Sequence, residues 1–139
     1  MKINPSDIQS KVVEVWEVKS MKGLSLDQQA ILFDKAIHAI EKRALQTLSH
    51  VTLMVILDRV LHQSSQICPL FAKAKIESNS LSFEEVHKDP QYTSKERLEA
   101  FRYLLVELLR VLGRITADIL TAPLHKELLK VAWIDPEKK

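Results

Sequence analysis

The residues best suited to chemistry are histidines on predicted helices. His38, His50 and His62 are spaced by twelve residues, so successive imidazoles turn by about 120° and lie about 18 Å apart along one helix. They therefore cannot share a metal ion. Asp34 precedes His38 by one helical turn, as Asp58 precedes His62, and each pair could hold an imidazole proton or supply two metal ligands.

Phosphoryl transfer to an imidazole needs an accessible histidine with a cation close by. His38 meets this requirement best because Lys42 and Arg43 follow it, and His62 is the second candidate. The chain has no ATP-binding glycine loop, and the residues around His38 do not match the motif of histidine phosphotransfer domains. A phosphoryl-accepting or small-molecule-binding helical bundle that uses His38 or His62 is therefore the alternative function.

Other chemical patterns in the chain are weak. Glu84 and His87 have the Glu-x-x-His spacing of one half of a di-iron site, but the chain contains no second copy. We find no nucleophile triad and no pair of catalytic carboxylates in an apolar setting. We therefore expect no metal site, no cofactor and no catalytic residue, and we favour a non-enzymatic protein.

The arginines of the chain do not predict a nucleic-acid surface. Arg110 and Arg114 share one side of a predicted helix, but Glu107 and Asp118 are interleaved with them. Such alternation is typical of a solvated face crossed by salt bridges. We therefore do not expect nucleic acid to be a partner.

Composition favours an all-α fold in a reducing compartment. The chain has 139 residues, 20 Lys and Arg against 18 Asp and Glu, and only two glycines, which is too little turn chemistry for a sheet protein. Cys68 is the only cysteine, so an intrachain disulfide is impossible. No secretory signal is recognised, and the uncharged stretch 44–57 is too short and too polar to span a membrane. We expect a cytoplasmic protein.

Two segments predict long helices. Between residues 98 and 119, apolar side chains recur at alternating steps of three and four, which keeps one apolar stripe along a helix expected over residues 94–120. The same period runs through residues 26–63 with no glycine or proline inside. We predict a second long helix there, antiparallel to the first, with a break near Ser49 as the alternative.

Shorter helices are predicted at both ends of a single domain over residues 1–139, of which 1–4 and 135–139 are expected to be frayed. Thr121 is the predicted N-cap of the last helix, and residues 73–80 are predicted to be an exposed connection. Helix starts elsewhere are marked by capping boxes, in which Ser or Thr precedes Glu or Gln by three residues. These pairs are Ser25 with Gln28, Ser82 with Glu85, and Thr93 with Glu96.

Close packing is predicted for one side of the helix over residues 94–120. Gly113, Ala117 and Thr121 recur every four residues, which makes a strip of small side chains. Such a strip lets a neighbouring helix approach closely and offsets the helix cost of a glycine, about 1 kcal/mol.

The predicted helix lengths favour self-association. A compact domain of this size is roughly 35 to 40 Å across, whereas a helix over residues 26–63 would be about 57 Å long. Such a helix would leave apolar surface uncovered, and two copies could cover each other as a four-helix-bundle dimer. If the helix breaks, a monomeric bundle of five or six helices is preferred instead.

Taken together, these patterns predict a non-enzymatic helical interaction module, a homodimer that acts as a regulator, adaptor or sensory segment. Its partners would be a second copy of the chain and possibly another protein. Large aromatic residues commonly anchor such contacts. The candidate surface anchors are Trp16, Phe71, Tyr103 and Trp133.

Overall fold

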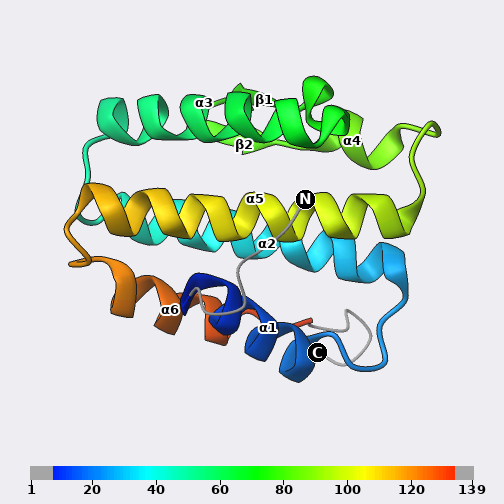
Figure 1. Ribbon diagram of the computed structural model, residues 1–139, viewed down its shortest axis with the longest axis horizontal. Coiled ribbons are helices and arrows are strands. Elements are labelled where there is room, and N and C mark those ends of the chain that lie inside the picture. Colours follow the sequence, from blue (N-terminus) through cyan, green and yellow to red (C-terminus); the bar gives the residue numbers. More distant parts are fainter. Residues whose placement is uncertain (1–7, 134–139) are drawn as a thin grey trace.

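The computed structural model describes residues 8–133, and 73% of these described residues are helical. Figure 1 shows the arrangement of the helices. The all-α prediction is therefore confirmed, while the frayed ends predicted at residues 1–4 and 135–139 lie outside the described residues. The α-helices are α1 (Ile8–Ser20), α2 (Leu26–Ala44), α3 (His50–Ile67), α4 (Glu84–Lys88), α5 (Ser94–Ile115) and α6 (Thr121–Lys130). A 3-10 helix, η1 (Pro69–Lys73), and a hairpin of β1 (Lys75–Glu77) and β2 (Ser80–Ser82) lie between α3 and α4.

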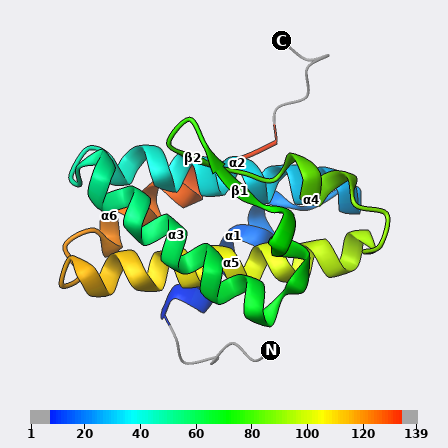
Figure 2. The same cartoon turned by 90° about the horizontal axis from the view of Figure 1, so that it is seen from above.

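The helices form three layers around a central pair. Figures 1 and 2 show α2 and α5 in the middle, with α3, the hairpin and α4 on one side and α1 with α6 on the other. The first turns of α2 and α5 meet, since Ser94 Oγ donates a hydrogen bond of 2.6 Å to Asp27 Oδ1. The central helices therefore run parallel, and α3 runs back in the opposite direction (Figure 1).

The prediction of one long helix over residues 26–63 is wrong, because the helix is interrupted between α2 and α3. Residues 45–49 are not helical, and the Ser49 side chain accepts a hydrogen bond of 3.1 Å from the backbone N–H of Thr52, which caps α3. The two halves pack separately on α5, and only α3 is antiparallel to it. The helix longer than the domain, whose uncovered apolar surface favoured a dimer, is therefore absent. The alternative architecture of five or six helices is the one observed.

The second long helix is shorter than predicted. α5 ends at Ile115 rather than near residue 120, because Ala117 and Asp118 adopt positive φ angles of 51° and 66°. The backbone N–H of Asp118 donates a 2.7 Å hydrogen bond to the carbonyl of Gly113, which closes the last turn. The turn places Leu120 at the N-cap of α6, so the N-cap predicted at Thr121 is wrong by one residue.

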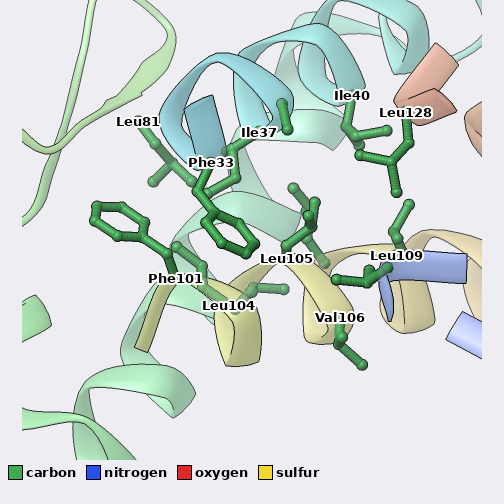
Figure 3. Close-up of a cluster of buried hydrophobic side chains, with 14 of the residues drawn as sticks. Phe33, Ile37, Ile40, Leu81, Phe101, Leu104, Leu105, Val106, Leu109 and Leu128 are labelled. Carbon is green, nitrogen blue, oxygen red and sulfur yellow. The ribbon is translucent and has the colours of Figure 1, made fainter. Parts of the chain in front are cut away.

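One continuous core joins the layers. In Figure 3, Phe33 and Ile37 of α2 point toward Leu105 of α5, while Leu128 reaches the same core from α6 and Leu81 reaches it from β2. All five side chains are buried. Burying one such side chain stabilises the fold by about 1.5–3 kcal/mol, so this core is the main favourable contribution to folding.

The stripe predicted on α5 is buried over most of its length. Its first five members, at positions 98, 101, 105, 108 and 112, belong to the core. Ile115 and Ile119 are exposed because the helix ends at the first of them.

The segment predicted as an exposed connection contains a short hairpin. Ile76 pairs with Leu81 across β1 and β2, and Ser78 and Asn79 form the turn with φ angles of 54° and 64°. Residues 73–80 are exposed or partly exposed as predicted, and Leu81, which follows them, is buried against α2.

The start of α4 was also mispredicted. Ser82 lies in β2, and Phe83 is the N-cap of α4 with no side-chain cap, so the predicted Ser82–Glu85 capping box is wrong. The capping boxes at Ser25 and Thr93 are confirmed.

Gly113 tests how tightly the α5–α6 turn packs. A Cβ at this buried position would lie 2.9 Å from Thr121 Oγ1 and 3.3 Å from Asp118 Oδ1. We predict that Gly113→Ala lowers the free energy of unfolding by about 1–3 kcal/mol, although alanine favours a helix by about 1 kcal/mol. Chemical denaturation would measure the change, and the loss should shrink in a Thr121→Ala background. A Gly113→Ala protein more stable than the wild type would contradict this packing.

Candidate functional site

The most concentrated polar cluster lies where α2 meets the hairpin and α4. His38 Nδ1 is 2.9 Å from Asp34 Oδ1, and His87 Nε2 is 2.9 Å from Asp34 Oδ2, so one carboxylate faces two imidazoles. The His87 ring also stacks on Phe101 at a centroid distance of 5.2 Å. The contact between Asp34 and His38 predicted from their spacing is confirmed, whereas the contribution of His87 from α4 was not predicted.

A buried carboxylate next to this cluster fastens the hairpin to α2. Glu41 accepts hydrogen bonds from Ser80 Oγ at 2.6 Å and from the backbone N–H of Leu81 at 2.9 Å. His38 Nε2 lies 2.8 Å from the Leu81 carbonyl oxygen. The two α2 side chains therefore bind both polar backbone groups of Leu81.

The charge of the cluster follows from these contacts. The Asp34 carboxylate raises the pKa of His38 to about 9; burial opposes this shift and the Leu81 carbonyl supports it. Burial alone would raise the pKa of Asp34, but the two imidazoles outweigh it and the pKa is lowered. Burial raises the pKa of Glu41 despite its hydrogen bonds to Ser80 and Leu81. His38 is therefore an imidazolium at neutral pH.

This geometry favours a structural role for His38. A phosphoryl group or a metal ion binds to the lone pair of an imidazole nitrogen, and a doubly protonated ring has none. Both His38 nitrogens face oxygen acceptors, on Asp34 and Leu81. A shallow pocket beside the ring includes Lys42 and His50 in its lining, but His38 would have to release Leu81 to act there.

The other candidate ligands are not gathered into a site. His62 lies on the exposed side of α3, where its Nε2 is 3.2 Å from Gln66 Nε2. Glu84 is paired with Lys88 at 2.9 Å, while His87 faces Asp34. Among residues 8–133, no group of three or more His, Cys, Asp or Glu side chains is arranged to hold a metal ion.

Two of the four predicted surface anchors are wrong. Trp16 and Phe71 are fully buried in the core: Trp16 packs edge-on against Phe33, and its Nε1 donates a 2.9 Å hydrogen bond to the Val131 carbonyl. Tyr103 and Trp133 are partly exposed. An aromatic residue on an amphipathic helix more often fills the core than the surface, and the sequence alone does not distinguish the two.

Charged side chains of α5 form one salt bridge within the helix, as their spacing predicted, and one to α1 that was not predicted. Arg102 makes two hydrogen bonds of 2.7 Å to the carboxylate of Glu17 on α1, and Arg110 pairs with Glu107. This supports the interpretation of a salt-bridged face.

Two exposed features were not predicted. Aliphatic side chains lie along the outer side of α1, and Trp133 lines a groove between the ends of α1 and α6. The first had a signal in the sequence, because Ile8, Val15 and Val18 follow one another at intervals of seven and three.

Comparison of the chain with protein-family models, with curated proteins and with solved structures found no match. Within residues 8–133, none of the helices combines the length and apolar character needed to cross a membrane.

The His38 contacts predict a pH dependence of stability. The folded-state pKa of His38, about 9, exceeds its ordinary value of 6.5, so the stabilisation is complete below pH 6.5 and is lost as the pH rises through 9. We predict that the urea midpoint of the wild type falls over this range more steeply than that of His38→Gln. His62→Gln is the matched control and should fall as the wild type does. Parallel curves for the wild type and His38→Gln would contradict the assignment.

Proposed function

We propose that the protein is a non-enzymatic helical interaction module that forms a homodimer through the outer side of α1. The observation that carries this proposal is that α1 is apolar on two opposite sides. Its inner side, with Val13 and Trp16, is buried in the core of its own chain. Its outer side exposes Ile8, Val15 and Val18 by 61%, 59% and 76%.

The exposed residues follow a heptad pattern. If Ile8 is an a position, Val15 is the next a position and Val18 the d position that follows it, while Lys11 occupies the first d position. We call these four residues the α1 seam. Coiled-coil helices pack through such positions, and the buried side of α1 faces away from them. A second helix can therefore lie on the seam without displacing the core contacts of α1.

The charges beside the α1 seam favour a second copy of the chain in parallel orientation. Glu14 is a g position and Lys19 the following e position, and both are exposed. In a parallel pair, Glu14 of each chain would face Lys19 of the other, which gives two salt bridges. In an antiparallel pair, equal charges would face each other. This self-complementarity supports a two-fold dimer rather than an unrelated helix.

The dimer proposed here replaces the one predicted from helix length. That prediction rested on a continuous helix over residues 26–63, which the structure does not contain. The present proposal depends only on α1. The phosphoryl-accepting alternative at His38 or His62 stays a prediction, with no contact in the structure that favours it over a structural role.

Light scattering with charge exchange tests the dimer. We expect the wild type to have twice the chain mass of 15.9 kDa, and Val18→Asp to be monomeric because it places a charge in the α1 seam. Glu14→Lys and Lys19→Glu should each weaken the dimer alone. An equimolar mixture of the two should form a heterodimer, since each mismatched pair becomes complementary.

The control is Val51→Asp, which changes a valine on α3 that is 75% exposed, against 76% for Val18, and should leave the mass unchanged. A wild-type monomer at high protein concentration would refute the homodimer. If Val18→Asp and both charge-reversal variants keep the mass of a dimer, the contact lies elsewhere on the chain.

A further inference from the structure

A second surface feature lies beside the C-terminal end of α1 and shares only Lys19 with the dimer contact proposed above. A groove of about 620 Å³ opens between the last turn of α1, the loop that follows it and the end of α6. Leu24, Leu129 and Trp133 give it an apolar wall. Lys19, Lys22 and Lys130 also line it, and among the described residues no carboxylate does.

The groove is held in shape by contacts beneath it. Trp16 Nε1 and Ser20 Oγ donate hydrogen bonds of 2.9 Å and 3.3 Å to the Val131 carbonyl, which fixes the chain after α6 against α1. Lys35 Nζ lies 5.2 Å from the centroid of the Trp133 ring, a cation–π contact that orients the indole. The apolar wall is therefore anchored to both α1 and α2.

The groove also has a concentrated positive charge. Lys19 and Lys130 lie in the last turns of α1 and α6, where a lysine also interacts favourably with the helix dipole. Lys130 contacts Glu127 at 3.4 Å. Lys22 lies in the loop beyond α1, so no helix end accounts for it. Three ammonium groups therefore line one apolar surface, and Lys35 contacts the Trp133 ring from α2.

We propose that this groove binds an acidic peptide segment of a partner protein, one that carries an apolar side chain among its carboxylates. The apolar side chain would lie on Trp133 between Leu24 and Leu129, and the carboxylates would pair with the surrounding lysines. Charge complementarity with the lysines indicates that the partner segment carries negative charge. The aliphatic wall fits a hydrophobic side chain better than a phosphodiester backbone, and a concave groove does not suit a flat membrane surface.

Anisotropy of a labelled peptide tests this proposal. The probe is a short peptide of glutamates around one central leucine, and the control peptide has glutamine in place of every glutamate. We expect the acidic peptide to bind the full chain, to lose affinity as salt is added, and to bind roughly tenfold more weakly to Lys22→Glu and to Lys130→Glu. Lys42→Glu, near the end of α2 and outside the groove lining, is the matched control and should bind as the wild type does.

The same titration separates this proposal from the dimer. Lys22 and Lys130 line the groove but take no part in the α1 contact, so Lys22→Glu should lose the peptide and keep the mass of the wild type, whether that mass is one chain or two. Failure of the acidic peptide to bind would overturn the proposal, as would equal binding to the wild type and Lys22→Glu. Tighter binding of an oligothymidylate or of phosphatidylserine vesicles would assign the groove to another class of partner. Binding only after deletion of residues 134–139 would assign it to the chain's own end.

Discussion

The fold depends on the parallel packing of α2 against α5. Phe33 and Ile37 from one helix meet Leu105 from the other in a core that excludes water, and the remaining elements attach to this pair (Figure 3). α3 and the hairpin cover one side of it, while α1 and α6 cover the other (Figure 1). Because both outer layers bury their apolar sides on the same pair, a change in the centre reaches every surface discussed above.

Polar contacts then fix the outer elements in position. His38 and Glu41 bind the backbone of Leu81 and hold the hairpin on α2, while the indole of Trp16 binds Val131 and holds the end of α6 on α1. Each contact satisfies a backbone group that would otherwise be costly to bury. The first gives His38 a structural role, and the second shapes the groove beside Trp133. Both surfaces proposed for partners lie on the α1–α6 side of the central pair.

The sequence predicted the helices better than their ends or the site. The stripe from Leu98 to Leu112 and the capping boxes at Ser25 and Thr93 are local patterns, so they could be recognised. The break at Ser49 had a local signal, an N-cap serine, but no glycine or proline accompanied it, and the apolar period continued across it. The approach of His87 to Asp34, 53 residues away in sequence, depends on how the elements pack and has no local signal. The same holds for the burial of Trp16, because a helix apolar on two sides does not reveal which side its own core takes.

Hydrogen exchange in the wild type and in Leu105→Ala tests the central role of the α2–α5 pair most directly. We expect the amides of α2 and α5 to exchange last, and Leu105→Ala to lower the free energy of unfolding by about 2–5 kcal/mol. The protection of amides in α1, α3 and α6 should fall together with that free energy. Unchanged protection of α1 and α6 in Leu105→Ala would show that the outer layer is stable without the central pair, and would contradict this account.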